Sequence, residues 1–506
     1  MTLLTERYAK HIRGQVCCFD RIIVTGMLPD IGHPQAMTRR LCAMNLRIFD
    51  YTQFAEPLRD QIRANAETLA RQAGLEIEFV SSVHGYRKEA RVAEIVAERG
   101  AHPGLVHILS AMEPCAAYKP WHNKTTGETY LKYTDGKCLH YYFYFIDAEF
   151  GLCYMRVPTW APFRLQFYCN GHNWLALRLK EAGIAFTQAD NTFHQIADFS
   201  RAQALSDEFS PEHLHRLLDH AAARYCPVVE QFPSGYHWSL MQVEFSSDLV
   251  FDRQEALGPL YETLSRTAIH AVKADNVATF LGRKLHPAYT DEVGNDFHTR
   301  IEGTRIKHHM GPVSLKMYDK HKLVLRIETT VNDVTFFKHH RKVEHRNGPS
   351  EVKLAPVRKT IYSLPVIREL LLAANRRYLE FLSELADPSA GLTDVERLAE
   401  PVRRNDRTYR GFNLFAGPDL ALLLAVVRGE FCISGFTNGA LRKLLPTATG
   451  AQMSRLIKRM RLHGLVRKVG KTYKYYLTKL GKRTVTAALK LRELVVIPSL
   501  AEGCPA

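Results

Sequence analysis

The sequence predicts an α/β body, three-layer or α+β in one or two subdomains, followed by a small basic C-terminal domain of helices and a β-hairpin. Stretches with strand and helix periodicity alternate along the first 200 residues, which is typical of layered α/β proteins. The positive charge lies elsewhere: residues 401–506 hold 20 Lys and Arg against 5 Asp and Glu, while the first 400 residues hold 48 against 47. A nearly neutral body therefore precedes a segment suited to a polyanion.

The composition is that of a globular protein with several domains. The chain has 506 residues, of which 46% are hydrophobic and 24% charged, and this excludes a wholly disordered or fibrous protein. Ten cysteines occur without a C-x-x-C pattern, which favours reduced thiols in the cytoplasm. The N-terminus lacks the apolar core of a signal peptide, and the longest apolar run, 420–427, is too short to span a membrane. We therefore expect a cytoplasmic protein without a membrane partner.

The first domain is expected at 1–205 as an α/β unit. Apolar runs rich in β-branched and aromatic residues predict its strands, and helical periodicity ended by glycine predicts its helices. The strands are expected at 15–27, 75–80 and 104–112, with two long strands within 140–169, and the helices at 56–73, 88–99 and 173–182.

The second domain is expected at 206–385 as an α+β unit with a basic hairpin. Its predicted strands are 236–245, 313–318 and 323–329, its helices are 257–272 and 366–382, and residues 319–322 form the hairpin turn. Residues 301–360 hold 13 Lys and Arg against 6 Asp and Glu. We therefore expect this hairpin to contact a phosphate backbone, through Arg305, Lys307, Lys316 and Lys320.

The third part, 386–412, is expected to be a linker, because its first residues combine Asp, Pro, Ser and Gly. The C-terminal domain, 413–497, then has helices at 418–428, 438–445 and 449–463, a hairpin from 465 to 477 with glycine at its tip, and a final helix at 478–494. In the third helix one face is apolar, with Met453, Leu456, Ile457 and Met460. The opposite face is polar, with Ser454, Lys458 and Arg461 flanked by Arg455 and Arg459.

This order of helix, helix, basic helix, hairpin and helix resembles the winged helix-turn-helix of MarR-like regulators over about 80 residues. The resemblance implies double-stranded DNA binding, with structured RNA as the other open partner, and a homodimer formed through the last helix. It implies that Ser454, Lys458 and Arg461 enter the major groove beside Arg455 and Arg459. It also implies that three hairpin lysines, Lys468, Lys471 and Lys474, touch phosphates or the minor groove.

Three carboxylates at or near strand ends are candidate metal ligands: Asp147, Glu244 and Glu328. Two-metal nucleases need two or three carboxylates converging from neighbouring strands, because Mg²⁺ and Mn²⁺ prefer oxygen ligands. The competing interpretation is that these carboxylates cap loops or pair with arginines. A Mg or Mn cofactor is expected only under the first interpretation, and otherwise none is.

Residues 303–328 are similar to a strand pair of some rolling-circle replication initiators, over the Lys-x-Tyr-Asp-Lys hairpin and the Leu-Arg-Ile-Glu that follows. The resemblance implies that Tyr318 attacks a DNA backbone and that a histidine pair holds a metal. Here His308 and His309 are adjacent, so they point to opposite faces of a strand. The alternative is a hairpin whose Lys316, Lys320 and Arg326 contact a phosphate backbone.

Two further patterns in the body have structural and functional interpretations. Cys138, His140, Cys169 and His172 are zinc-ligand types, but their spacing matches no zinc finger, so core positions are favoured. The aromatic run 140–145 is expected to be a strand buried on both faces, with base stacking as the alternative.

These patterns leave three functional hypotheses. The first is a nucleic-acid-binding protein, either a regulator or a mobile-element-associated factor. The second is a metal-dependent DNA-processing enzyme of the nuclease, nickase or transposase-like kind. The third is a structured-RNA-binding protein.

Overall fold

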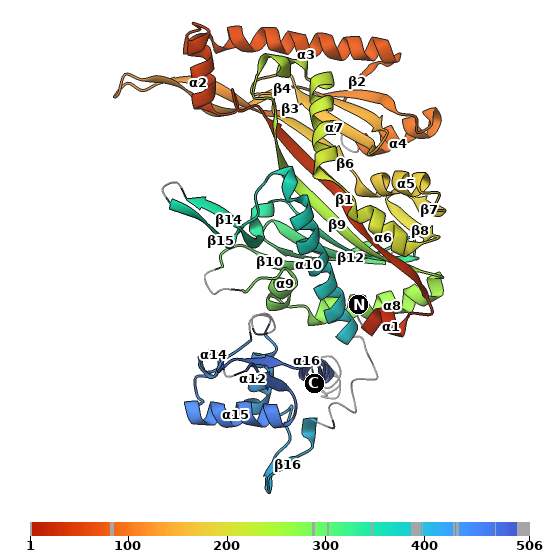
Figure 1. Ribbon diagram of the computed structural model, residues 1–506, viewed down its shortest axis with the longest axis vertical. Coiled ribbons are helices and arrows are strands. Elements are labelled where there is room, and N and C mark those ends of the chain that lie inside the picture. Colours follow the sequence, from red (N-terminus) through yellow and green to blue (C-terminus); the bar gives the residue numbers. More distant parts are fainter. Residues whose placement is uncertain are drawn as a thin grey trace, which may run out of the picture. The chain divides into compact units, whose positions relative to one another are not determined.

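The protein has a mixed α/β fold built on a large central sheet, seen in the computed structural model of Figure 1. The structure describes residues 3–80, 86–285, 289–300, 303–345, 348–385, 396, 398–428, 431, 435–470 and 472–492. Eleven strands form the sheet, in the order β10-β11-β12-β13-β9-β1-β6-β5-β4-β3-β2. Among the helices of these described ranges, none is both long and apolar enough to cross a membrane.

The chain divides into two compact units that do not follow consecutive stretches of sequence. Unit 1 comprises Met1–Gln15, Ser247–Thr329 and Leu370–Ala506, and unit 2 comprises Val16–Ser246 and Thr330–Glu369. Three strands contain residues of both units: β1 (Ile12–Met27), β9 (His237–Phe251) and β13 (Val324–Val331). The division at residue 205 stays a prediction.

Unit 2 holds most of β1 and β9 and the elements between them. Its further strands are β2 (Ile77–Phe79), β3 (Gly104–His122), β4 (Thr129–Asp147), β5 (Gly151–Pro158), β6 (Leu165–Cys169), β7 (Phe186–Ala189), β8 (Thr192–Ile196), β14 (Lys338–His345) and β15 (Gly348–Pro356). Its helices are α2 (Pro34–Ala43), α3 (Tyr51–Ala73), α4 (Lys88–Arg99), α5 (Gly171–Glu181), α6 (Phe199–Asp207) and α7 (Pro211–Tyr225).

The aromatic strand β4 is buried on both faces, as predicted. On one face Phe143 stacks on Tyr225 of α7, with ring centroids 4.7 Å apart. On the other face Tyr142 and Tyr144 belong to a core cluster with Val92 of α4. Helices thus cover both faces of the sheet here, which makes this part of unit 2 three-layered and excludes base stacking on these rings.

Unit 1 holds the elements at the other end of the sheet order and the C-terminal segment. They are α1 (Leu3–Arg7), α8 (Gln254–Ala271), α9 (Ala274–Phe280), β10 (Val293–Arg300), β11 (Gly303–Met310), β12 (Val313–Lys320), most of β13, and most of α10 (Leu364–Leu385). The predicted turn between β12 and β13 is a tight one, in which His321 and Lys322 both adopt positive φ, 53° and 57°. This conformation fits a two-residue hairpin turn, because its twist matches that of the strands.

A buried ion pair lies in the core of unit 1. Arg326 Nε and Nη2 of β13 donate to the two carboxylate oxygens of Asp248 on β9, at 2.7 and 2.6 Å. Both side chains are 0% exposed. Next to them Asn375 of α10 donates to Ser247 Oγ at 3.1 Å and accepts from Thr329 Oγ1 at 2.6 Å. These polar contacts join two strands and a helix in the buried interior of unit 1, so Arg326 is not available to contact a phosphate.

The C-terminal segment (the described residues from 398 to 492) has its own apolar core. Its elements are β16 (Val402–Arg404), β17 (Arg407–Tyr409), α12 (Gly417–Val426), α14 (Asn438–Leu444), α15 (Gly450–Leu462), β18 (Val466–Lys468), β19 (Tyr475–Leu477) and α16 (Lys479–Leu491). Between α12 and α14, residues 432–434 lie outside the described residues, and Phe436 forms a single bridge to Tyr475.

We predict that Asp248→Ala lowers the free energy of unfolding of the protein by about 3–5 kcal/mol, because it leaves the Arg326 charge buried without its counter-ion. Chemical denaturation followed by circular dichroism measures this change. The double substitution Asp248→Leu with Arg326→Met should recover most of the loss, since it removes both charges. Equal losses in the single and double variants would contradict the role given to the ion pair.

Candidate nucleic-acid interface and carboxylate groups

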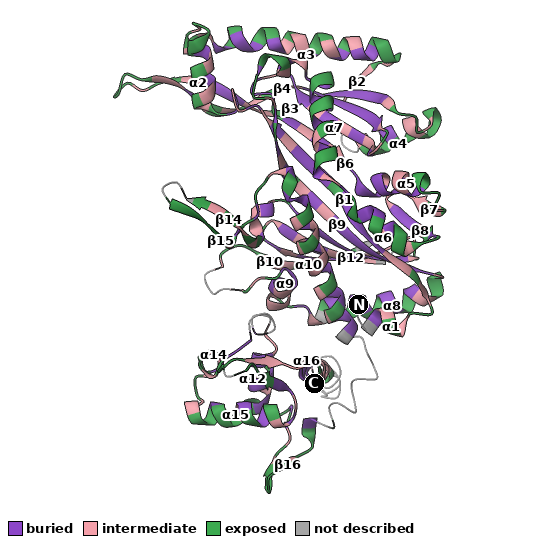
Figure 2. Ribbon diagram, in the orientation of Figure 1, coloured by how far each residue is buried: buried purple, intermediate pink, exposed green. Residues whose placement is uncertain are grey.

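The third helix of the C-terminal segment, α15, exposes a polar and basic face. Thr449 caps it: its hydroxyl accepts from Gln452 N, and the Gln452 side chain accepts from Thr449 N at 2.8 Å. Such a capping box fixes where a helix begins and therefore which face it turns to the core. The buried face includes Met453, Ile457 and Met460, and the alternation along the helix is visible in Figure 2. Four predicted residues are exposed on α15: Ser454, Arg455, Lys458 and Arg461.

Arg459, predicted to contact nucleic acid, is instead a buried structural residue. Its guanidinium donates to both carboxylate oxygens of Asp419, each at 2.9 Å, and also to the backbone carbonyls of Arg410 and Gly411. It stacks over Phe412 with 3.9 Å between the guanidinium carbon and the ring centre. Burial alone would raise the pKa of the Asp419 carboxyl, but the hydrogen bonds from Arg459 lower it below its usual value. Arg459 therefore connects α15 to α12, and its guanidinium is not available to contact a nucleic acid.

The hairpin β18–β19 extends the exposed basic surface. Lys468 and Lys474 are exposed, as predicted contact residues should be, whereas Lys471 lies outside the described residues. Tyr473 is 81% exposed, and Lys468 Nζ lies 5.4 Å from its ring centre. An exposed aromatic ring between two lysines can lie against a sugar or a base. Tyr473 was not among the predicted contact residues, although its place in the hairpin tip between lysines is a signal that the sequence carries.

Two contacts position the exposed face of α15. Asn438 at the start of α14 donates to Ser454 Oγ at 2.9 Å and to the carbonyl of Gly450 at 3.0 Å. Lys458 Nζ lies 5.8 Å from the ring centre of Tyr409 on β17. The N-terminal half of α15 is thereby held against α14.

The basic residues of the hairpin β11–β12 are less available than those of α15. Arg305, Lys307, Lys316 and Lys320 are all only partly exposed. Lys307 Nζ lies 3.9 Å from Asp296, and Lys316 Nζ donates to Glu328 Oε1 at 2.6 Å. Lys316 was predicted to contact a phosphate, but its ammonium is engaged in this ion pair with the buried carboxylate of Glu328.

Glu328 and Tyr318, two predicted catalytic residues, interact directly within unit 1. The Tyr318 hydroxyl donates to Glu328 Oε2 at 2.5 Å, and Glu328 is 2% exposed. The Glu328 carboxylate thus accepts a hydrogen bond from the Tyr318 phenol on one oxygen and from the Lys316 ammonium on the other. Chemically, this arrangement gives the phenol an adjacent base, the feature that activates a hydroxyl nucleophile.

Asp147, the third predicted carboxylate on a strand end, serves as a turn cap. Its Oδ1 accepts from the backbone N of Glu149 at 2.8 Å and of Phe150 at 2.9 Å, just after β4. In the sheet order β4 is separated from β1 by β5 and β6. The structure therefore removes Asp147 from the candidate catalytic set, in favour of the loop-capping interpretation.

A carboxylate pair in unit 2 joins the predicted Glu244 to Asp20, a residue that was not among the predicted ligands. Carboxylate oxygens of the two side chains, on β9 and β1, lie within 4.8 Å of one another. Asp20 Oδ1 lies 3.1 Å from His172 Nδ1 and accepts from Asn191 Nδ2 at 2.5 Å. Glu244 Oε2 lies 3.8 Å from Arg21 Nε. Two carboxylates at this separation can share a divalent cation. The signal in the sequence for Asp20 is a charged pair, Asp20-Arg21, inside an apolar strand.

The histidines and cysteines weighed as metal ligands in the sequence have other surroundings. His308 is buried between Asn295 and Tyr378, and burial, together with His309, lowers its pKa to about 3. His309 faces Glu292 and Asp296, on the opposite face of the strand as predicted. Of the four zinc-ligand types, Cys138 and His140 lie 3.8 Å apart (Sγ to Nδ1), Cys169 is fully buried, and His172 contacts Asp20.

No protein-family model, curated protein sequence or solved structure matches this chain. The functional interpretation of these residues therefore rests on their geometry in the structure.

We predict that Arg459→Ala destabilises the C-terminal segment by about 3–5 kcal/mol, because it leaves Asp419 buried without its partner. The matched variant Arg455→Ala removes an exposed charge from the same helix and should change stability by less than about 0.5 kcal/mol. Urea denaturation monitored by hydrogen exchange of α15 amides measures both. Comparable stability of the two variants would contradict the structural role of Arg459, which would then again be a candidate for contacting nucleic acid.

Proposed function

We propose that the protein binds nucleic acid, double-stranded DNA first, through a winged helix-turn-helix formed by its C-terminal segment. The observation that carries this proposal is the exposed polar and basic face of α15, followed by the basic hairpin β18–β19. The concentration of charge supports it, since residues 401–506 hold 20 of the 68 Lys and Arg but only 5 of the 52 Asp and Glu.

The dimensions of DNA favour α15 as the recognition helix. The major groove, about 12 Å wide, admits one α-helix, and helices of this motif place their N-terminal residues against base edges. Ser454 and Arg455 lie in the first turns of α15, while Lys458 and Arg461 follow along the exposed side. We assign the first two to base edges and the other two to the flanking groove and phosphates. Lys468, Tyr473 and Lys474 of the hairpin then contact the adjacent backbone or minor groove.

We predict that Lys458→Gln with Arg461→Gln weakens binding to a random-sequence 30-base-pair DNA by about 10–100-fold at 100 mM salt. Each lost phosphate contact lowers the slope of log K against log salt by about 0.9, so the slope should fall by nearly 2. Fluorescence anisotropy at several salt concentrations measures both quantities.

The matched control is Lys479→Gln with Arg483→Gln, which removes the same charge from α16. It should leave the slope nearly unchanged. Equal loss in both double variants would indicate a diffuse basic surface and would contradict the groove assignment. Tighter binding of a 30-nucleotide RNA hairpin than of the duplex DNA would assign the segment to structured RNA instead.

The second candidate function is metal-dependent processing of the bound nucleic acid. The observation that favours it is the Asp20–Glu244 carboxylate pair, whose oxygen ligands suit Mg²⁺ or Mn²⁺. Two such ions or one can polarise a phosphate and activate water for cleavage. In this arrangement Asp20 and Glu244 would hold the metal. Tyr318 of unit 1, which has Glu328 as its base, is tested separately as a nucleophile.

We predict that the protein incubated with labelled DNA and Mn²⁺ cleaves the strand, and that Asp20→Asn or Glu244→Gln reduces the rate at least about 100-fold, because each removes a metal ligand. Asp147→Asn should leave the rate unchanged, because that carboxylate caps a turn. A covalent protein–DNA adduct lost in Tyr318→Phe would identify a nicking reaction. Absence of cleavage by the unmodified chain would leave the binding function alone.

A further inference from the structure

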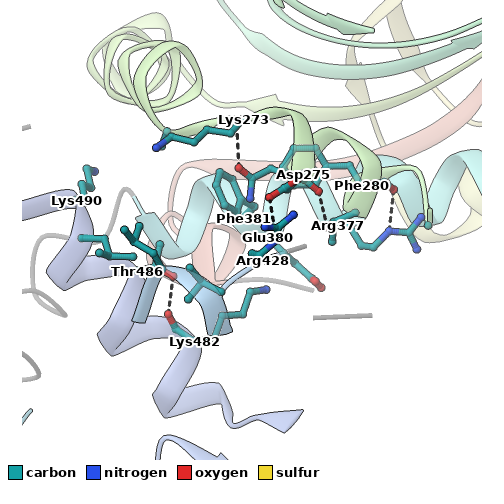
Figure 3. A pocket seen from close by; sticks show the side chains of 17 residues that line it. Lys273, Asp275, Phe280, Arg377, Glu380, Phe381, Arg428, Lys482, Thr486 and Lys490 are labelled. Carbon is teal, nitrogen blue, oxygen red and sulfur yellow. Dashed lines mark hydrogen bonds and ion pairs between the residues drawn. The ribbon is translucent and has the colours of Figure 1, made fainter. Parts of the chain in front are cut away.

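A cavity of about 500 Å³ lies in unit 1, lined mostly by residues of α9, α10, α12 and α16 (Figure 3). Its wall mixes cations with carboxylates, and some of them pair, as Arg428 Nε and Asp275 do at 3.7 Å. The wall therefore favours no single class of ligand. A more selective surface lies in unit 2, at the end of the hairpin that joins β3 to β4.

The end of the β3–β4 hairpin packs one face against the protein. On this packed face Leu131 is buried, and the Tyr118 hydroxyl donates to the carbonyl of Ile31 at 2.6 Å. The Tyr133 hydroxyl donates to the carbonyl of Gly32 at 2.8 Å. These contacts fix the hairpin against the segment that precedes α2. The opposite face is therefore presented on a rigid support, which lowers the entropy cost of binding a partner.

The opposite face of the hairpin carries two aromatic rings and two lysines. Trp121 pairs with Tyr130 across the hairpin, and Lys119 pairs with Lys132. Residues directly opposite each other, and residues two apart on one strand, share a face of the sheet. The side chains agree with this, since Lys132 Nζ lies 3.9 Å from the ring centre of Trp121 and 5.6 Å from that of Tyr130. Trp121 is 44% exposed, and Lys119 is exposed as well.

The charge of this face is positive, because neither of its two residue pairs contains a carboxylate. Glu128 lies in the loop between the strands, and Asp135 pairs with Ala116, which places it on the packed face. Like charges at directly opposite positions repel each other, so the pairing of Lys119 with Lys132 disfavours the hairpin. An anion bound between the two ammonium groups would remove this repulsion.

We propose that this face binds single-stranded nucleic acid, with a base stacked on Trp121 and the neighbouring phosphates on Lys119 and Lys132. Surfaces that bind single strands combine exposed aromatic rings, on which bases stack, with cations that follow the backbone. A duplex keeps its bases stacked on one another, so the exposed ring favours an unpaired strand. The flexible Lys132 side chain exchanges its contact with the Trp121 ring for a phosphate. This binding is distinct from the proposed duplex binding, because none of these residues lies in the C-terminal segment.

The test uses Trp121 as its own reporter in the full chain, since it is the most exposed of the four tryptophans. The first probe is an oligothymidine of about 12 nucleotides, a length within the usual site sizes of such surfaces. The second is an abasic oligonucleotide of the same length, which keeps the phosphates and lacks the bases. We expect oligothymidine to quench the fluorescence saturably and the abasic strand to bind at least about tenfold more weakly. Equal affinity for the two strands, or no quenching by oligothymidine, would overturn the proposal.

Substitutions of the ring separate stacking from a structural role. Trp121→Ala should abolish the quenching and weaken oligothymidine binding by about 10–100-fold, whereas Trp121→Phe should keep most of the affinity, because a phenyl ring still offers a face for stacking. Tyr473→Ala removes an exposed ring from the hairpin β18–β19 and is the matched control, which should leave the quenching unchanged. Circular dichroism checks that each variant is folded. A loss of affinity in Trp121→Phe as large as that in Trp121→Ala would contradict stacking.

The two lysines are tested through the salt dependence of binding. Lys119→Gln with Lys132→Gln should lower the slope of log K against log salt by about 1.4, since each phosphate contact to a single strand contributes about 0.7. The matched control is Lys137→Gln with Lys180→Gln, which removes two exposed lysines from the other face of β4 and from α5. It should leave the slope nearly unchanged. Equal slopes in the two double variants would indicate diffuse attraction and would contradict the assignment of phosphates to this face.

A last comparison separates this face from the proposed duplex site and from a lipid surface. Quenching by oligothymidine should persist in the variant Lys458→Gln with Arg461→Gln, because those residues lie on α15. Duplex binding that depends on α15, without quenching of Trp121 by oligothymidine, would leave the proposed function standing and overturn the single-strand proposal. Stronger quenching by phosphatidylglycerol vesicles than by oligothymidine would assign the face to an anionic membrane instead.

Discussion

Two opposite charges enclosed in the core of unit 1 constrain the strands around them. Asp248 and Arg326 are fully buried, and such a pair is tolerated only where its geometry is close to ideal. The two parallel hydrogen bonds between them permit one register of β13 against β9, because a slip by one residue would leave a bare charge in the apolar interior. Glu328 stands two residues from Arg326 on the same strand and hence on the same face. Its contacts with Lys316 and Tyr318 extend the polar contacts of β13 to β12, the neighbouring strand on its other side.

The sequence predicted local structure well and distant relations poorly. The helix at 88–99 matches α4 at both ends, and the helix predicted to begin at 449 has Thr449 as its N-cap, because periodicity and capping are encoded within a few neighbouring residues. The strand predicted at 104–112 continues as β3 to His122, past polar residues that local patterns cannot assign. Asp20 could not be paired with Glu244 from sequence, since 224 positions separate them and only the strand order β9-β1 brings them together.

The same limit applies to the basic residues, which look alike in sequence and differ in the fold. On α15, Arg455 and Arg459 stand four positions apart, yet one is exposed and the other carries four hydrogen bonds in the interior. Lys316 likewise forms an ion pair with the buried carboxylate of Glu328. Counting charge shows where cations are concentrated in the sequence, but the contacts of each side chain decide which cations stay exposed. In this chain the exposed cations of the C-terminal segment include those of α15 and the hairpin β18–β19, the surface for which nucleic-acid binding is proposed.

The place of β1 in the sheet has a consequence for the order in which the protein is made. Of the strands of this sheet, β1 leaves the ribosome first, but it lies in the interior of the strand order, between β6 and β9. Its partner on one side begins at Leu165 and on the other at His237. At translation rates of about 5–20 residues per second, β1 waits on the order of ten seconds or more for its first neighbour. During that time both edges of β1 lack a partner strand. Its apolar side chains, including Val16, Ile22 and Val24, which are buried in the folded protein, are then not yet covered. The nascent chain is therefore a natural client for chaperones that shield unpaired strands.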